Sequence, residues 1–83
     1  MKKYINPENQ RYVYYICETL NGYAIQVLNV VRDERYPFTP AIAYKNGLTL
    51  PEDFRCTCSA NEKAELELQL ERLAKQNVLL QIE

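Results

Sequence analysis

The longest stretch of regularly placed apolar residues lies between residues 11 and 32. Tyr12–Cys17 and Tyr23–Val31 are rich in β-branched and aromatic residues, which favour strands, and Asn21-Gly22 lies between them. Two such runs joined by Asn-Gly are typical of a β-hairpin, because both residues accept the positive φ of a type I′ turn. We therefore predict an antiparallel hairpin over residues 11–32.

The register set by that turn makes both faces of the hairpin apolar. One face carries Tyr12, Tyr14, Ile16 and Leu20 beside Ile25, Val27 and Val31, and the other carries Val13, Tyr15 and Cys17 beside Ala24, Leu28 and Val30. A hairpin with one face in water alternates more cleanly, so we expect each face to be covered at least in part. The same register places Arg11 opposite Arg32, and the repulsion of these charges predicts fraying or a bulge there.

Residues 60–76 have the composition of an amphipathic helix. Ser59 and Glu62 have the spacing of a capping box, in which each side chain accepts from the other residue's backbone N–H. At 100° per residue, one apolar stripe along the helix consists of Leu66, Leu70, Leu73 and Ala74. The polar side of the helix consists of Asn61, Glu65, Gln69, Arg72 and Gln76. Glu65–Glu71 also alternates like a strand, but its residue types favour a helix. Asn77 fits a left-handed residue after the helix.

The remaining segments predict short elements. Tyr4-Ile5 indicates a short strand before a turn at Asn6–Asn9, where proline and asparagine favour tight geometry. Asp33–Arg35 is interpreted as the end of the second hairpin strand. Ala41–Tyr44 predicts a short strand that returns as Leu48–Leu50 through a turn at Asn46-Gly47.

The last apolar segment, Val78–Ile82, predicts a final strand buried on both faces, and the alternative is a helix that continues to residue 83. Pro40 and Pro51 flank the predicted short strands at Ala41–Tyr44 and Leu48–Leu50, and these prolines confine the two strands to a sheet edge. The chain is thus predicted to be a single α+β domain over residues 1–83. Its small antiparallel β-sheet would carry one α-helix packed on one face, in the order β-β-(β)-α-β.

Composition places the chain among small globular proteins. With 83 residues it buries a modest share of its surface, so that a partner would add useful stability. The net charge of −1 argues against non-specific nucleic-acid binding, which needs an excess of Lys and Arg. Met1-Lys2-Lys3 is not followed by an apolar segment, and no apolar run approaches the roughly 20 residues of a membrane span. We expect a cytoplasmic protein without membrane contact.

Candidate catalytic chemistry is sparse. The chain has no histidine, which removes the commonest general base and metal ligand. Glu52-Asp53 is a possible carboxylate pair, but beside Pro51 it is better explained as a solvated turn. Gly22 and Gly47 are the only glycines, so no Gly-rich phosphate loop is present. These features predict a protein that is not an enzyme and has no cofactor.

Three cysteines offer the most pointed alternative. An odd number of cysteines without an export signal favours reduced thiols. Cys56 and Cys58, with Cys17, could hold a soft metal or form a redox pair, although a closed zinc site needs a fourth ligand. In an extended segment Phe54, Cys56 and Cys58 share one side, and we predict that they face the core. A thiol- or metal-dependent protein remains the alternative.

Seven tyrosines and no tryptophan are unusual for this length. Tyrosine is enriched at protein interfaces, although strand tyrosines often pack in ordinary ways. Beside Arg11 and Arg32 the hairpin tyrosines could also stack with single-stranded nucleic acid, which is the less favoured alternative. The candidate partner-binding residues are Tyr12, Tyr14, Tyr15, Tyr23, Tyr36 and Tyr44.

We therefore expect a non-enzymatic protein-binding module. It would mask or bridge a surface of a larger assembly, as small inhibitors and adaptors do, and proteins of this size are common in phages and mobile elements. The partner would be another protein or a second copy of the chain. A homodimer is the simpler expectation, because it would also bury more apolar surface.

Overall fold

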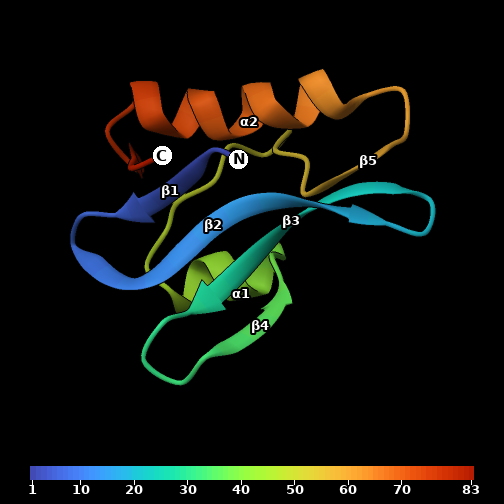
Figure 1. Cartoon of the computed structure of the whole chain (residues 1–83). Helices are drawn as coiled ribbons and strands as arrows, with labels where there is room; N and C mark the ends of the chain where they lie inside the picture. The colour runs from blue at the N-terminus through green and yellow to red at the C-terminus, as the bar shows by residue number, and fades with distance from the viewer.

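The computed structural model describes all residues from 1 to 83 and shows a small α+β fold (Figure 1). The sheet is antiparallel and six-stranded, and its order is β4-β3-β2-β1-β6, with β5 paired to β3. The elements along the chain are β1 (Lys3–Asn6), β2 (Asn9–Thr19), β3 (Gly22–Asn29), β4 (Glu34–Pro37), α1 (Pro40–Lys45), β5 (Thr57–Ser59), α2 (Lys63–Lys75) and β6 (Leu80–Gln81). The predicted fold class is confirmed, with one helix more than predicted.

The predicted hairpin is confirmed as β2 and β3, but its register is two residues away from the prediction. Thr19 pairs with Gly22, and the turn consists of Leu20 and Asn21. Gly22 has no positive φ, so the predicted type I′ turn is wrong. A Cβ on Gly22 would overlap the carbonyl oxygen of Cys58, which shows that this glycine allows β5 to approach β3. A shift of two residues leaves every side chain on its predicted face.

The open end of the hairpin also differs from the prediction. Val30 N–H donates to the Arg11 carbonyl at 2.9 Å, so Arg11 does not lie opposite Arg32. The chain turns after Asn29, whose Oδ1 accepts from the N–H groups of Val31 and Arg32 at 3.1 and 3.2 Å. Glu34 begins β4, so Asp33–Arg35 is not the end of the second strand.

The predicted strand at Ala41–Tyr44 is wrong, because these residues belong to α1. Thr39 Oγ1 caps the helix by accepting from Ile42 N–H at 3.2 Å, and Pro40 occupies its first turn. Gly47 follows with φ +81, a left-handed conformation that suits glycine. Proline inside the start and glycine just after the end are typical of helices. Asn46-Gly47 therefore ends a helix and does not form the turn of the predicted second hairpin.

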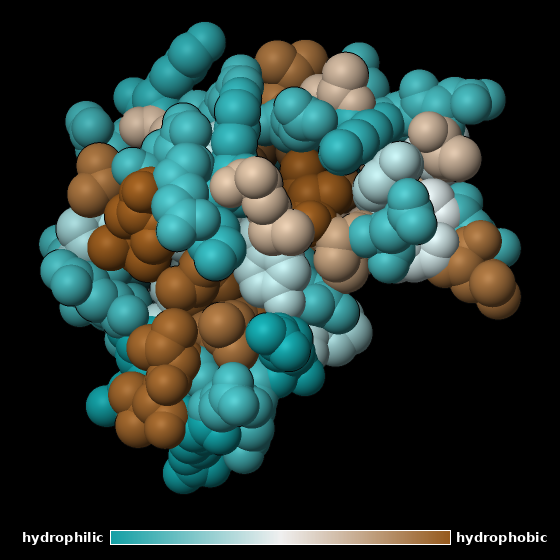
Figure 2. Space-filling view, viewed as in Figure 1, coloured by the Kyte–Doolittle hydropathy of each residue, from teal (hydrophilic) through white to brown (hydrophobic).

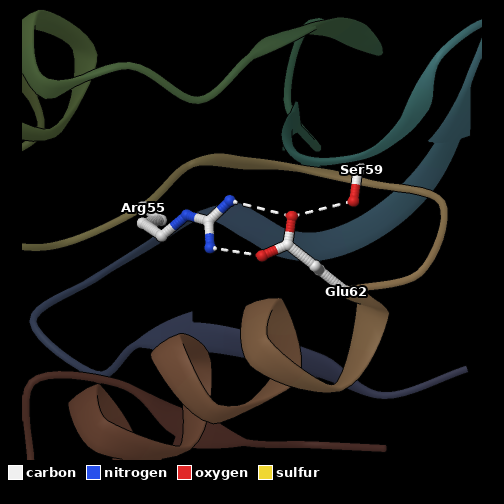
Figure 3. A network of polar contacts seen from close by, with 3 residues as sticks. All are labelled: Arg55, Ser59 and Glu62. Carbon is white, nitrogen blue, oxygen red and sulfur yellow. Dashed lines mark hydrogen bonds and ion pairs between the residues drawn. The ribbon is translucent and has the colours of Figure 1, made fainter.

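The second helix is confirmed, but it begins at Lys63 and not at Ala60. The predicted capping box does not form, because Ser59 ends β5 and no side chain caps the helix. Figure 3 shows what the two side chains do instead. Ser59 Oγ donates to Glu62 Oε1 at 2.8 Å, and Arg55 Nη1 donates to Glu62 Oε2 at 3.0 Å. The three residues thereby connect β5 to the start of α2.

The C-terminal segment follows the prediction only in part. Asn77 has φ 61, as predicted, and α2 ends at Lys75, so the alternative of a continuous helix is wrong. The final strand is short: β6 comprises Leu80 and Gln81 and pairs with β1. Leu79 is buried, but Leu80 is 53% exposed, so burial on both faces is also wrong.

The hydrophobic core lies between the two helices and one face of the sheet. The sheet contributes Tyr4, Tyr14, Ile25 and Val27, while the helices and connections contribute Phe38, Ala43, Leu48, Leu66, Leu70, Leu73 and Leu79. The ring centroids of Tyr14 and Phe38 are 5.2 Å apart in an edge-to-face arrangement. Gln69, predicted on the polar side of the helix, is buried. The segment before β5 lies on that side, since Arg72 donates to both Gln69 and Asp53.

Candidate protein-interaction surface

The six candidate tyrosines do not share one surface. Tyr14 is fully buried in the core, and its hydroxyl accepts from Asn46 Nδ2 at 3.2 Å. Burial raises the pKa of Tyr14 to about 12. Tyr44, on α1, is 86% exposed. Tyr15 lies on the sheet face opposite Tyr14, because neighbouring strand residues alternate.

The other three tyrosines are half-buried and pack against the core from its margins. Tyr23 pairs with Cys58 near the β2–β3 turn, and Lys63 Nζ lies 5.3 Å from the centre of its ring. Tyr12 and Tyr36 lie at the opposite end of the sheet, beside α1. Whether any of the six contacts a partner remains a prediction.

A second surface is formed by the sheet face that points away from the helices. In antiparallel strands, directly paired residues lie side by side on the same face. The pairing therefore builds one continuous row of apolar side chains across four strands: Leu80, Ile5, Val13 and Leu28. Arg35 of β4 pairs with Leu28 and ends the row. We call this sheet face the open face.

Two further rows complete the open face. The first contains Lys3, Tyr15, Gln26 and Pro37, and the second contains Cys17, Ala24 and Thr57. Tyr15 donates its hydroxyl hydrogen to Gln26 Oε1 at 2.9 Å, which links the two side chains on this face of the sheet. The open face is thus mainly apolar, and the prediction that both hairpin faces are apolar is confirmed.

Neither helix covers the open face. The buried apolar residues of both helices belong to the core cluster, whose strand residues point to the opposite side of the sheet. In Figure 1 the strands β3 and β4 pass in front of α1, while α2 lies along the top of the sheet. Figure 2, seen from the same side, shows brown hydrophobic side chains over the sheet and down to the β3–β4 turn. Neither α1 nor α2 therefore lies over this part of the sheet.

Burial varies strongly across this surface. Val13, Tyr15 and Ala24, at the centre of the open face, are each 9% exposed. Ile5 and Leu28 are half-buried, whereas Leu80 and Ile82 at the C-terminal end are 53% and 45% exposed. Val30 and Val31 at the β3–β4 turn are 49% and 72% exposed. The accessible apolar surface therefore lies at the margins of the sheet, around β6 and at the β3–β4 turn. The sequence indicated Val13 and Leu28, but the contribution of Ile5 and Leu80 depends on a pairing that no local signal encodes.

Positive charge flanks the apolar row. Lys3 Nζ lies 3.5 Å from the Glu83 carboxylate, and this exposed pair is largely neutral. Arg35 is exposed and belongs to none of the four ion pairs in the molecule. The guanidinium of Arg35 is thus free to meet a carboxylate next to the apolar row.

The cysteines are divided between the two faces. Phe54, Cys56 and Cys58 pack against the core, as predicted, whereas Cys17 lies on the open face. Burial raises the pKa of the Cys17 and Cys56 thiols, which lowers their reactivity. The structure groups no three His, Cys, Asp or Glu side chains in a way that could hold a metal ion. The thiol- or metal-dependent alternative therefore gains no geometric support.

Neither helix is both long and apolar enough to cross a membrane. No family model, curated protein or solved structure matches this chain.

Proposed function

We propose that this chain is a non-enzymatic protein-binding module that uses the open face to hold a partner protein. One observation carries the proposal: the apolar row Leu80–Ile5–Val13–Leu28 crosses four strands, and no helix lies over it. An antiparallel sheet with one solvated face normally alternates apolar and polar residues. An apolar second face is better explained by a protein that covers it.

Charge favours a different protein over a second copy of the chain. The open face carries Lys3 and Arg35, and its nearby carboxylate, Glu83, already pairs with Lys3. In a face-to-face dimer the open face of the second copy would offer Arg35 no free carboxylate, because Glu83 already pairs with Lys3. An apolar surface flanked by Asp or Glu fits better, because Arg35 can pair with a carboxylate there. The homodimer is the second candidate, and it would offset the small core.

The function of such a module would be to mask or bridge a surface of a larger assembly, as an inhibitor or adaptor does. We place it in the cytoplasm, because its three cysteines are free. A phage or mobile-element origin is consistent with its size and remains part of the proposal.

A matched pair of leucines tests the proposal. Leu80 on the open face is 53% exposed, and Leu68 on α2 is 49% exposed. Leu80→Glu places a charge on the open face, and Leu68→Glu places the same charge elsewhere. Surface changes of this kind usually alter stability by less than about 0.5 kcal/mol, so both variants should fold.

We expect cross-linking and mass spectrometry in the native host to find a partner with wild type and Leu68→Glu, and to lose it with Leu80→Glu. Sedimentation of the same three proteins identifies the occupant. If wild type and Leu68→Glu are dimers and Leu80→Glu is a monomer, the occupant is a second copy. Equal capture of every partner by all three proteins, with all three monomeric, would contradict the proposal.

A further inference from the structure

A polar hollow lies at the end of the sheet beside α1, away from the apolar row. Its volume is about 420 Å³, and it is bordered by the first part of β2, the end of β3, the start of β4 and the end of α1. Volumes of about 300–1,000 Å³ are typical of small-molecule sites. The hollow is therefore large enough for a small ligand and not only for water.

The charged side chains in this hollow are unbalanced. Arg11, Arg32 and Lys45 are positive, and Glu34 alone is negative, so the local net charge is +2 in a chain whose overall net charge is −1. None of these four side chains takes part in an ion pair. Three cations that share a small space repel one another. An anion of charge −2 would neutralise them.

Neutral hydrogen-bond donors complete the lining. Asn29 is buried, and its Oδ1 is held by two backbone N–H groups. Its Nδ2 therefore points away from that turn, and it has no partner within the protein. The hydroxyls of Tyr12 and Tyr36 lie close together at the same hollow. Burial raises the pKa of Tyr36, and a tyrosine hydroxyl that is protonated at neutral pH has one hydrogen to donate.

The lining is also held in place by the fold. Asn46 is buried, and its amide is anchored on the hydroxyl of Tyr14 in the core. Ile42 and the two tyrosine rings give the hollow an apolar side. A ligand that fits would join a compact anionic group to a small apolar or aromatic body.

We propose that this hollow binds the phosphate group of a small phosphomonoester. Such a group carries about −1.5 to −2 charges at pH 7, which matches the local charge of +2. Guanidinium groups present paired donors that match two phosphate oxygens, and a lysine adds a point charge. This site is separate from the open face, so its failure would leave the proposed protein-binding function unaffected.

The two probes are phenyl phosphate and phenyl sulfate, which have similar shapes but different charges at neutral pH. Binding is followed by changes in amide chemical shifts during titration at constant ionic strength. We expect phenyl phosphate to bind several-fold more tightly than phenyl sulfate, with shifts concentrated at residues 29–36 and 42–46. The affinity for phenyl phosphate should fall as the pH drops from about 7.5 to 5, because its second pKa is near 6.

Two helix-terminal lysines provide a matched control. Lys45 is the last residue of α1 and lines the hollow, whereas Lys75 is the last residue of α2 and does not. We expect Arg32→Gln to weaken phenyl phosphate binding about tenfold, because a charge-assisted hydrogen bond is lost. Lys45→Gln should weaken it several-fold, and Lys75→Gln should leave it unchanged.

Three results would overturn the proposal. The first is no saturable shift up to about 10 mM phenyl phosphate, which would be weaker than a specific site of this kind. The second is equal binding of phosphate and sulfate esters. The third is an equal effect of Lys45→Gln and Lys75→Gln, which would indicate diffuse attraction of anions. All side chains substituted here are exposed, so unchanged melting temperatures confirm that the variants are folded.

Discussion

Glu62 joins the end of β5 to the start of α2 through contacts with Arg55 and Ser59 (Figure 3). The hydrogen bonds from these two side chains and the charge of Arg55 lower the pKa of Glu62 from 4.5 to about 2. The folded state therefore favours ionised Glu62 more strongly than the unfolded state does. The resulting stabilisation is fully present above about pH 4.5 and is lost as the pH falls toward 2.

This shift gives a pH-dependent prediction for Glu62→Gln. We expect the variant to melt at a lower temperature than wild type at pH 7, and the difference to shrink steadily as the pH falls from 4.5 toward 2. Thermal melts followed by circular dichroism measure it. Glu65→Gln is the control, because Glu65 lies in the first turn of α2 and forms no ion pair. A Glu62→Gln difference that stays constant with pH would show that this network does not stabilise the fold.

Single residues were predictable from sequence where their role depends on near neighbours. Asn77 adopts the left-handed conformation expected after a helix, and Pro7 lies in the predicted turn. Gln69 was not predictable, because a segment distant in sequence covers its side of α2. The same holds for Glu62: its spacing from Ser59 predicts a cap, but Arg55 lies close enough to hold its carboxylate.

At the scale of elements, the contact of β5 with β3 depends on Gly22. An ideal Cβ on Gly22 would overlap the carbonyl oxygen of Cys58 and would lie 2.8 Å from the carbonyl carbon of Ser59. Both of these atoms belong to the backbone of the β5 segment. Backbone cannot move aside as a side chain can, so Gly22→Ala should separate the two strands. We expect a loss of about 2 kcal/mol in the free energy of unfolding, as for other overpacked sites.

Urea denaturation measures this loss, and Gly47→Ala is the comparison. Gly47 has φ +81 and no atom within 4 Å of its ideal Cβ, so only backbone strain opposes alanine there. That strain costs about 1 kcal/mol. A Gly22→Ala protein as stable as wild type would mean that β5 does not pack closely against β3.

Elements whose signals are local were found from sequence, and those that need a distant partner were not. The hairpin and α2 carry long runs of suitable residues, so both were predicted. The observed register of the hairpin differs by two residues from the predicted one, because Gly22 lies in β3 and allows β5 to approach. A rule based on the turn residues alone does not consider this contact with β5. For α1, Thr39 and Pro40 carried a helix signal, but six residues are too few for apolar periodicity to decide.

At the scale of the whole molecule, both helices lie on one side of the sheet. The sequence predicted two apolar hairpin faces and one helix, which already implied a face in need of cover. It could not show that the second helix lies on the same side as the first. Nor could it place Ile5 and Leu80 in the apolar row, because β1 and β6 pair across more than 70 residues of sequence.

The most direct test of this account is the solvent accessibility of methyl groups, measured by NMR with a soluble paramagnetic agent. The protein is kept at a concentration where sedimentation shows a monomer. We predict strong broadening of the methyl signals of Leu80, close to that of exposed Leu68, and clear but weaker broadening for half-buried Ile5 and Leu28. The signals of Leu66, Leu70 and Leu73 should stay sharp. Methyl signals of Ile5 and Leu28 as well protected as those of Leu66 would contradict an open apolar face.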